Sequence, residues 1–514
     1  MAGSKEERIT RRELLKSGAA AALGLAGLVA DTGTASGAHG QKERRAVSSN
    51  NSTGGKPNFV FILLDDLGWR DIGCYGSEFY ETPNLDRLAA EGMRFTDAYA
   101  ACPVCSPTRA SIMSGKYPAA VGVTDWIGAH TKGKLIDAPY IDHLPLEEKS
   151  LARALKEGGY ATWHVGKWHL GNRPYYPENH GFDVNVGGCR WGYPPNGYFS
   201  PWRIETLEDG PEGEYLTDRL TDEAIRLIRG SDAPFFLHLC YYAVHTPIQG
   251  KPEYVERFAG KAAEMGLDKL DTFAEGPFFP CEHKKDRRIR RRLIQSDPAY
   301  AAMVQSVDEN VGRLLQAISD AGQADNTVVV FTSDNGGLAT AEGSPTSNRP
   351  LSEGKGWMYE GGTREPLMVK WPGVTTPGSV CPVPVTSPDF YPTMLEAAGL
   401  DPIPEQHRDG VSLVPLLKGG DRLDREAIYW HYPHYGNQGG TPGSSLRAGD
   451  YKLIEFFEDG RMELYNLRDD IGEERDLAAA QPALAQKLHK MLVSWRTEVE
   501  AKMPEPNPDY VPWR

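Results

Sequence analysis

The sequence predicts an α/β fold: a large mixed, mostly parallel sheet flanked by helices, followed by a smaller C-terminal antiparallel sheet with a helix. Two continuous apolar runs, Asn58–Leu64 and Thr327–Thr332, have the pattern of parallel strands that are buried on both faces. Amphipathic segments lie between them, such as Tyr300–Ala321, which ends at Gly322. Strands that alternate with helices indicate a mostly parallel sheet.

The remaining elements are predicted from the same periodicities. We expect further helices between the two apolar runs, at Leu146–Glu157 and Tyr215–Arg229. Beyond residue 425 the pattern changes to short strands separated by turns and then one helix, with the bounds Ala427–Tyr432, Tyr451–Phe457, Met462–Tyr465 and Pro482–Lys502. This change predicts a main domain over residues 57–424 and an α+β subdomain over residues 425–514.

The N-terminus has the pattern of an export signal. Residues 10–16, TRRELLK, resemble a twin-arginine motif; an apolar run follows over Gly18–Ala30, and small residues at 35–38 offer a cleavage region. We therefore predict a twin-arginine-type signal peptide over residues 1–38, a linker over residues 39–56, and a periplasmic or secreted protein. An uncleaved membrane anchor is the alternative. However, the apolar run is shorter than the roughly 20 residues of a membrane span, so we expect no stable membrane insertion.

Composition narrows the function classes. The chain has 514 residues and a formal net charge of −14, which argues against a general nucleic-acid-binding protein. Its seven cysteines are odd in number and irregularly spaced, which argues against a disulfide framework and leaves at least one thiol free or modified. Cys102 and Cys105 form a Cys-x-x-Cys pair, but no second pair or thioredoxin-like context supports a redox or metal site there.

The segment that starts at Cys105 is the most informative one. Pro107 fits the first turn of a helix, because its missing N–H group costs nothing there. Cys105 would then lie at the helix N-terminus, where free N–H groups and the helix dipole favour an anion. Arg109 lies in the same first turns and can direct its guanidinium toward a tetrahedral oxyanion. A buried cysteine near an ordinary helix start is the alternative interpretation.

Acidic residues follow both predicted parallel strands. Asp65 and Asp66 end the first apolar run, and Asp334 and Asn335 end the second. Ligands of such sheets bind beyond the carboxyl ends of the strands, and two desolvated carboxylates require a cation. Four side-chain oxygen donors, without histidine or thiolate, favour Ca²⁺ or Mg²⁺ over Zn²⁺. The sequence therefore predicts a site for one hard divalent cation.

Together these motifs resemble a known family. Cys105-x-Pro107-x-Arg109, followed by Ser114-Gly-x-Tyr-Pro118, is similar to the signature of type I, formylglycine-dependent sulfatases of the arylsulfatase and N-acetylgalactosamine-sulfatase kind, and the similarity extends from about Pro57 to the C-terminus. This resemblance implies an alkaline-phosphatase-like fold. It also implies that a formylglycine-generating enzyme converts Cys105 to 3-oxoalanine (formylglycine), and that residue 105 completes the metal shell. The main domain would then be the catalytic domain.

The resemblance also implies roles for four further residues. Gly166–Gly171, with Lys167 and His169, matches a family motif, as do His245 and Lys355 in their own segments. Lys167 and Lys355 would contact the sulfate oxygens. One hydroxyl of the hydrated aldehyde would attack sulfur while His245, helped by Lys355, protonates the leaving alcohol. His169 would then remove the proton of the second hydroxyl, so that the aldehyde re-forms and sulfate leaves.

Weaker signals have mixed interpretations. His238 lies within an apolar run and is predicted to be a core histidine, and Arg364 is predicted to be structural. His431 and His434 are candidates for the mouth of the pocket.

Two segments could contribute to substrate binding. The basic run His283–Arg292 could be a solvated insertion or helix, or a rim that attracts a polyanionic glycan. The Gly-, Pro- and aromatic-rich segment Arg190–Tyr198 could be a loop that stacks on sugar rings, or a structural loop.

The function that the sequence predicts is hydrolysis of sulfate monoesters on a sulfated polysaccharide or a glycosaminoglycan-derived saccharide. A phosphonate or phosphate ester hydrolase of the same superfamily is the alternative within this fold. A polyanion-binding protein whose Cys105 is never converted is the alternative from another class.

Overall fold

The computed structural model describes residues 55–512. The signal peptide predicted over residues 1–38 lies outside the described residues, as does the linker predicted over 39–56 except for its last two residues. Within the described part, no helix combines the length and apolar character needed to cross a membrane. All seven cysteines of the chain fall in this part and are free thiols.

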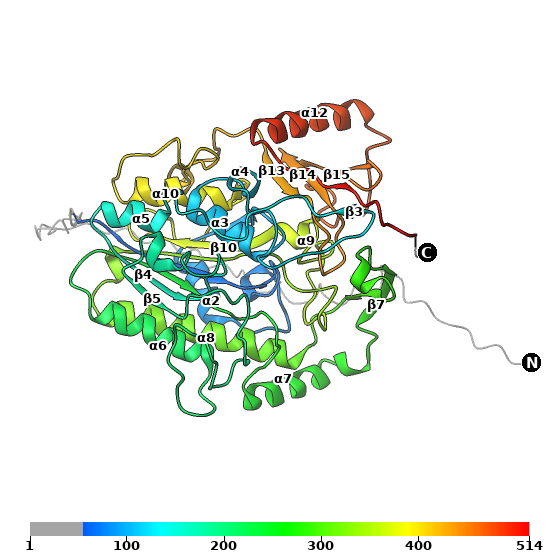
Figure 1. The fold of residues 1–514 in the computed structure, drawn as a ribbon. Helices are drawn as coiled ribbons and strands as arrows, with labels where there is room; N and C mark the ends of the chain where they lie inside the picture. The colour runs from blue at the N-terminus through cyan, green and yellow to red at the C-terminus, as the bar shows by residue number, and fades with distance from the viewer. Residues whose placement is uncertain (1–54, 513–514) are drawn as a thin grey trace, which may run out of the picture. The chain divides into compact units, whose positions relative to one another are not determined.

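The main sheet is mixed and mostly parallel, as predicted (Figure 1). In spatial order its strands are β11 (Ser379–Cys381), β2 (Met93–Tyr99), β10 (Arg364–Lys370), β9 (Thr327–Ser333), β1 (Asn58–Leu64), β6 (Phe235–Cys240), β4 (Ala161–Gly166) and β5 (Val184–Val186), and β12 (Val385–Thr386) pairs with β2. From β9 to β5 all neighbours are parallel, whereas β10 is antiparallel to both of its neighbours.

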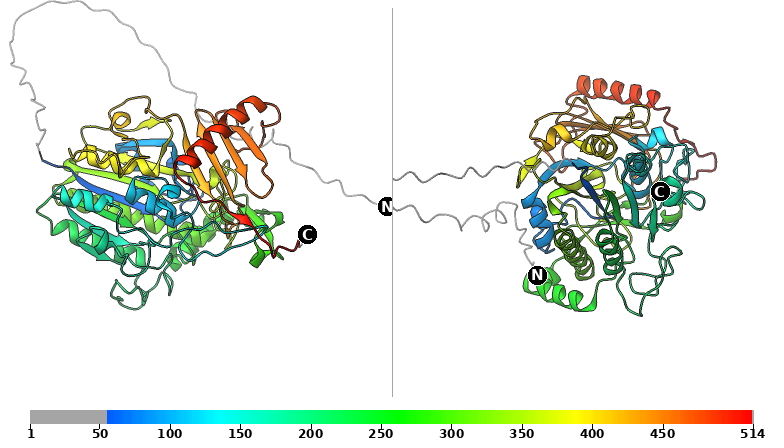
Figure 2. Two further views of the ribbon diagram at one scale, coloured as in Figure 1. Left: turned by 45° about the horizontal axis from the view of Figure 1, so that its top comes forward. Right: turned by 90° about the vertical axis from the view of Figure 1, so that its left-hand side faces the viewer.

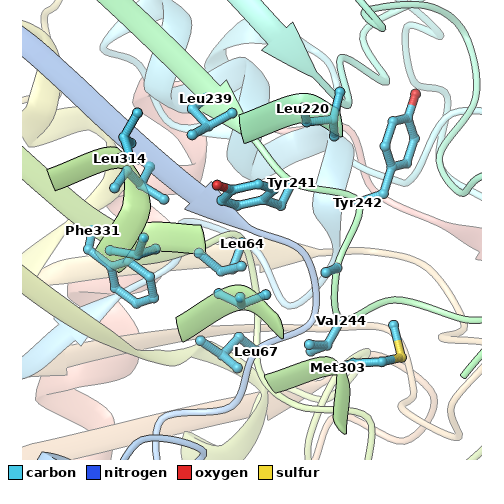
Figure 3. Close-up of a cluster of buried hydrophobic side chains, with 14 of the residues drawn as sticks. Leu64, Leu67, Leu220, Leu239, Tyr241, Tyr242, Val244, Met303, Leu314 and Phe331 are labelled. Atoms are coloured by element: carbon cyan, nitrogen blue, oxygen red, sulfur yellow. The ribbon is translucent and has the colours of Figure 1, made fainter. Parts of the chain in front are cut away.

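Strand β1 is buried on both faces because alternate side chains enter two different cores. Val60, Ile62 and Leu64 pack against helices α2 (Pro83–Glu91), α6 (Leu216–Arg229) and α8 (Pro298–Asp320). Their neighbours Phe59, Phe61 and Leu63 pack against α3 (Cys105–Ser114), α5 (Leu151–Glu157) and α10 (Phe390–Ala397). Figure 3 shows the first core, where Leu64, Leu239 and Phe331 from neighbouring strands lie near Leu220 of α6 and Leu314 of α8.

The C-terminal strands form a separate antiparallel sheet in the order β13 (Ile428–Tyr432), β14 (Gly443–Ala448), β15 (Tyr451–Phe456) and β16 (Met462–Asn466). Helix α12 (Pro482–Glu498) covers one face of it, as Figure 2 shows. This packing buries Leu446, Leu453 and Leu492 together. The predicted subdomain content is therefore present, although β14 was not predicted and α12 ends before the predicted Lys502. The domain boundary near residue 425 stays a prediction.

Two local predictions need correction. Helix α5 begins at Leu151 rather than at Leu146, because the Ser150 hydroxyl accepts a hydrogen bond from the Arg153 N–H and caps the helix there. The basic run is neither a helix nor a fully solvated insertion, because Arg288–Arg292 forms strand β8, which pairs with β7 (Phe273–Phe278) in an antiparallel hairpin.

The remaining elements are short connections and one longer helix. They are α4 (Pro118–Val121), β3 (Leu135–Ile136), α7 (Pro252–Glu264), α9 (Glu360–Thr363), α11 (Val414–Leu417), β17 (Glu505–Pro506) and six 3₁₀ turns at Gly73–Tyr75, Pro177–His180, Leu267–Lys269, Glu282–Lys284, Ala324–Asn326 and Ser387–Asp389.

Trp430 of β13 joins the C-terminal sheet to the end of β2. Its ring lies 5.3 Å from that of Tyr99, and its Nε1 donates to the Ala100 carbonyl at 2.8 Å. Because the side chain is fully buried, we predict that Trp430→Ala lowers the free energy of unfolding by about 3–5 kcal/mol, measured by chemical denaturation. The half-exposed Val493 of α12 provides the control, and Val493→Ala should change stability by less than about 0.5 kcal/mol. Equal effects of the two substitutions would contradict this role of Trp430.

Candidate active site

The sequence-predicted site residues meet at one edge of the sheet because four neighbouring parallel strands end there. Leu64 of β1 pairs with Ser333 of β9, so the residues that follow these strands, Asp65 and Asp334, leave the sheet at the same level. Lys167 follows β4, and its N–H donates to the Cys240 carbonyl at the end of β6. The chain after β6 is tied to β1 in turn, because the Val244 N–H donates to the Asp65 carbonyl. Carboxyl ends of parallel strands are where such sheets place their ligands.

Each of the three carboxylates at this edge forms an ion pair with one basic side chain. All six side chains are buried, so these pairs are shielded from water and balance one another in charge. The pairs are Lys167 Nζ to Asp65 Oδ2 at 2.7 Å, Lys355 Nζ to Asp66 Oδ1 at 2.8 Å, and Arg109 Nε to Asp334 Oδ2 at 2.8 Å.

The oxygen donors of this cluster fit a hard divalent cation. Asp65 Oδ1 and Asn335 Oδ1 are buried and have no hydrogen-bond partner. The Asn335 amide donates to Asp66 Oδ1 at 2.8 Å, and the Asp66 N–H donates to Asp334 Oδ1 at 3.3 Å, so these two bonds link Asp66, Asp334 and Asn335. Buried acceptors without a donor are costly, and a cation with a preference for oxygen ligands would satisfy them.

Burial also sets the charge states of the first two carboxyl groups. Burial raises the pKa of Asp65 to about 8 against the opposing effect of Lys167, and the neighbouring Asp334 and Asp66 raise it further. For Asp66, burial also raises the pKa, but Lys355, His245 and Lys167 outweigh it and hold the pKa at about 2. A divalent cation would favour the ionised form of both groups.

Cys105 is the first residue of α3, as predicted, and Val104 is its extended N-cap. The thiol is buried, and Sγ lies 3.2 Å from Nδ1 of His169. Burial raises the pKa of this thiol despite the opposing charges of Lys167 and Lys355. A protonated thiol is a weak nucleophile, so an unmodified Cys105 is poorly suited to attack an ester.

Arg109 lies behind the site rather than in it. Its guanidinium donates to Asp334 through Nε and to the Lys167 carbonyl through Nη1 at 2.9 Å. The side chain is 2% exposed, and Arg109 does not line the cavity described below. These contacts let Arg109 orient Asp334 and Lys167, and Lys167 is likewise buried and does not line the cavity. Direct contact of either side chain with an oxyanion stays a prediction.

Two histidines flank Cys105 and are held neutral. Burial, together with Lys167 and Arg109, lowers the pKa of His169 well below its usual value. Burial and Lys355 lower the pKa of His245 to about 3, against the opposing charge of Asp66. His245 Nδ1 lies 2.9 Å from the Thr246 carbonyl, which requires the proton on Nδ1 and leaves Nε2 as the acceptor in the neutral ring.

A cavity of about 480 Å³ opens above these residues. Its lining includes Cys105, His169, His245 and Lys355 and the aromatic residues Trp126, Trp191 and Tyr193. The remaining wall is polar and is formed by Asn172, Arg190, Glu342, Asn437 and Gln438. Aromatic and polar side chains around the ammonium group of Lys355 suit an anionic group on a polar ring.

Several weaker predictions can now be judged. His431 and His434 do not line the cavity: His431 Nδ1 is hydrogen-bonded to Ser444 at 2.7 Å, and His434 Nε2 to Thr124 at 2.9 Å. Both are buried beside the C-terminal sheet, so their predicted place at the pocket mouth is wrong.

The predictions that His238 is a core residue and that Arg364 is structural are confirmed. His238 is a core residue, with Nδ1 3.1 Å from Nδ1 of His164. Arg364 is buried in ion pairs with Glu360 and Asp97, each at 2.8 Å. The first part of the Arg190–Tyr198 segment lines the cavity, whereas the basic run does not.

Sequence reasoning missed most of the cavity wall. Trp126, Glu342, Asn437 and Gln438 belong to three separate loops and carry no motif. The sequence pattern of the Arg190–Tyr198 segment also did not indicate a separate role for Gly192. A Cβ atom at Gly192 would lie 2.4 Å from the His169 ring, so the bare backbone there defines where that ring can lie.

Comparison with known proteins gives consistent results. The family model named Sulfatase matches residues 57–400, and a model of the C-terminal region of N-sulphoglucosamine sulphohydrolase matches residues 353–498. The chain is similar to human N-acetylgalactosamine-6-sulfatase, with 33% identity over 399 residues, covering 73% of this chain and 68% of that protein. It is similar to a sulfatase of Formosa agariphila, with 33% identity over 521 residues, covering 86% and 88%.

Solved structures agree with these relatives. The structure of Ps i-CgsB superimposes with a TM-score of 0.68 at 30% identity, covering 86% of this chain and 92% of that one. The same protein was solved with k-i-k-neocarrahexaose. The phosphonate monoester hydrolase of Agrobacterium radiobacter has a TM-score of 0.60 at 21% identity and shares the fold.

A mostly parallel sheet that gathers its charged residues at the carboxyl ends of neighbouring strands, with an antiparallel C-terminal sheet, places the protein among hydrolases of the alkaline phosphatase superfamily. Within that superfamily the chain belongs to the sulfatase family, whose members are sulfuric ester hydrolases.

The contact between Gly192 and His169 yields a prediction. Gly192→Ala should displace the His169 ring, because a Cβ contact of 2.4 Å cannot be accommodated, and should reduce kcat for an aryl sulfate at least about tenfold with the fold intact. Gly260→Ala in α7 is the matched control, since a Cβ there meets nothing within 4 Å. Unchanged kcat in Gly192→Ala, with circular dichroism confirming a native fold, would show that the position of His169 does not limit catalysis.

Proposed function

We propose that this chain removes sulfate from a sulfated saccharide, using a formylglycine formed from Cys105 and one divalent cation, Ca²⁺ or Mg²⁺. The observation that carries the proposal is the position of Cys105. It heads helix α3, lines the cavity beside His169, and lies close enough to Asp334 and Asp65 for their charges to raise the pKa of its thiol. The buried thiol is a poor nucleophile itself, which supports conversion to a group with two hydroxyls when hydrated.

Asp65, Asp66, Asp334 and Asn335 would hold the cation together with residue 105, because they supply the oxygen donors at this edge of the sheet. When bound, the cation would supply positive charge for the nucleophile and for a sulfate oxygen. Arg109 would keep Asp334 and the Lys167 carbonyl in place from behind.

Two lysines and two histidines would perform the remaining steps. The Lys167 and Lys355 ammonium groups would bind sulfate oxygens and offset the charge that repels an anionic nucleophile from an anionic ester. His245, helped by Lys355, would protonate the leaving alcohol oxygen from Nε2. That nitrogen carries no proton in the resting neutral ring, and the negative charge of a bound ester would raise the pKa of His245 so that Nε2 gains the proton it delivers. His169, whose Nδ1 lies next to residue 105, would accept the proton that lets the aldehyde re-form and sulfate leave.

The walls of the cavity support a saccharide as the carrier of the sulfate. Trp126, Trp191 and Tyr193 offer ring faces for the apolar side of a sugar, and the Arg190 guanidinium lies 4.3 Å from the centre of a Trp191 ring. The names of the relatives, an N-acetylgalactosamine-6-sulfatase and a protein solved with a neocarrahexaose, point toward galactose-type sugars.

We also propose maturation before export. The twin-arginine pattern at residues 10–16 supports delivery of a folded protein to the periplasm or the outside, which is compatible with modification of Cys105 by a formylglycine-generating enzyme in the cytoplasm.

Replacing Cys105 tests the nucleophile. Cys105→Ala should abolish hydrolysis of an aryl sulfate while leaving thermal unfolding nearly unchanged, and Cys105→Ser should not restore turnover, because serine provides no second hydroxyl. Mass spectrometry of the tryptic peptide around residue 105 should show the aldehyde in the wild type. Assaying an aryl phosphonate with the same preparation separates a sulfatase from a phosphonate hydrolase. Turnover by Cys105→Ala at the wild-type rate would reject the proposal.

Removing the metal tests the cation site. Dialysis against a chelator should abolish hydrolysis and lower the melting temperature, and adding Ca²⁺ or Mg²⁺ should reverse both, because a ligand at about 100 times its Kd stabilises a protein by about 2.7 kcal/mol. Asp65→Asn should reduce the rise in melting temperature on adding Ca²⁺ or Mg²⁺, because it removes one charged oxygen ligand of the cation. Metal-free protein that keeps its activity and melts at the same temperature with and without these ions would contradict the site.

A further inference from the structure

The β7–β8 hairpin concentrates positive charge in an acidic protein. Between His283 and Arg292 the chain has seven lysines and arginines and one acidic residue, Asp286, whereas the whole chain has a formal net charge of −14. Such a local reversal of charge is unlike the rest of the surface, and the proposed reaction at the cavity does not use it.

The two faces of strand β8 differ in what their side chains bind. Ile289 is buried with Phe279, Cys281 and Tyr435 in a small core of its own, so the neighbouring positions 288 and 290 point outward. Arg291, on the same face as Ile289, pairs with Glu353 at 2.7 Å.

The outward arginines have no such partner. Arg287, Arg288 and Arg290 are exposed, and no ion pair joins any of them to a carboxylate in the described part of the chain, although Glu275 lies across the ladder from Arg290. Their positive charge is therefore presented to solvent and is available to an external anion.

Aromatic rings hold two of these arginines in place. The Arg290 guanidinium lies 3.8 Å from the centre of the Phe273 ring, and the Arg288 guanidinium lies 4.5 Å from that of Phe278. Arg288 also donates from Nη1 to the Gly276 carbonyl at 3.1 Å. Stacking on a ring reduces the entropy that a long side chain loses on binding, and the N–H groups that remain on these two exposed guanidiniums can donate to an anion such as a sulfate group.

The hairpin is also attached to the wall of the cavity. Lys284 Nζ donates to the Asn437 carbonyl at 2.7 Å, and Asn437 lines the cavity. On the other side, the Arg292 N–H donates to the Ala339 carbonyl, and the Ser344 hydroxyl donates to the Arg290 carbonyl, so β8 holds both ends of the loop that carries the cavity residue Glu342. The exposed arginines therefore belong to a hairpin that is hydrogen-bonded to two segments of the cavity wall without lining the cavity itself.

We propose that Arg287, Arg288 and Arg290 form a docking surface for an anionic polysaccharide chain, next to the cavity that receives its terminal sulfated sugar. The inference rests on the proposed function and narrows its substrate to polymers or long oligosaccharides. A chain with net charge −14 repels a polyanion at long range, and a fixed basic surface beside the cavity reverses that repulsion where the substrate must approach. A monosaccharide sulfate would gain nothing from it.

A binding experiment tests this surface without turnover. Two full-length proteins are passed over immobilised chondroitin sulfate and immobilised carrageenan. One carries Cys105→Ala, and the other carries Cys105→Ala together with Arg287→Gln, Arg288→Gln and Arg290→Gln (the triple variant). We expect about five- to tenfold weaker binding of the triple variant at low salt to at least one polymer, with the difference shrinking as salt is raised. The matched control combines Arg87→Gln, Arg229→Gln and Arg475→Gln, which removes three exposed arginines outside the hairpin and should leave binding unchanged.

Three results would overturn the docking surface. In the first, the protein binds neither polymer at low salt. In the second, the hairpin and control variants lose polymer binding equally. In the third, the protein binds a DNA duplex as tightly as the polymers and through the same arginines, which would indicate a general polyanion surface. Hydrolysis of a small aryl sulfate by the hairpin variant of the wild-type background separates the two proposals. The kcat/KM of the hairpin variant for this small substrate should equal that of the wild type. A wild type that does not hydrolyse the aryl sulfate would defeat the proposed function. A hairpin variant that loses binding of polymers only would support the docking surface.

Discussion

The structure depends on three carboxylates that are buried side by side at the ends of β1 and β9. Asp65, Asp66 and Asp334 cannot remain ionised there without positive charge at contact distance, because burial alone raises the pKa of a carboxyl group. The fold supplies that charge from distant parts of the chain: Arg109 from α3, Lys167 from the end of β4, and Lys355 from the loop before α9. Arg109, Lys167 and Lys355 therefore both stabilise the buried carboxylates and shape the reactive edge of the sheet.

The C-terminal sheet contributes to this arrangement through a second buried charge network. Lys452 of β15 pairs with Glu360 at 2.9 Å and with Glu473 at 3.2 Å, and the Glu360 N–H donates to Glu473. Glu360 begins α9, shortly after Lys355, so the network anchors the segment that delivers this lysine to the site. A buried network of this kind is expensive to disrupt, and it ties the position of Lys355 to correct packing of the C-terminal sheet.

The net negative charge of the chain and the basic hairpin have opposite effects on a sulfated polymer. A formal net charge of −14 opposes the approach of a sulfated polymer. The cluster of seven lysines and arginines between His283 and Arg292, with Arg288 and Arg290 stacked on phenylalanine rings, allows attraction at one place without changing the sign of the net charge. The basic hairpin is joined directly to the polar part of the cavity lining, because the loop that carries Glu342 is hydrogen-bonded to β8.

The sequence by itself determined the two central strands of the main sheet, the helix that Cys105 heads and the residues that gather at the sheet edge. These follow from local rules: apolar runs such as Asn58–Leu64 form buried strands, Pro107 favours a helix start, and acidic pairs after parallel strands lie at a common edge. Only the tertiary structure decided which neighbours these residues acquire. It turned Arg109 toward Asp334, placed His434 away from the cavity, made the basic run a strand, and assembled the wall from unrelated loops. Such outcomes depend on contacts between residues far apart in the chain, and no local pattern encodes them.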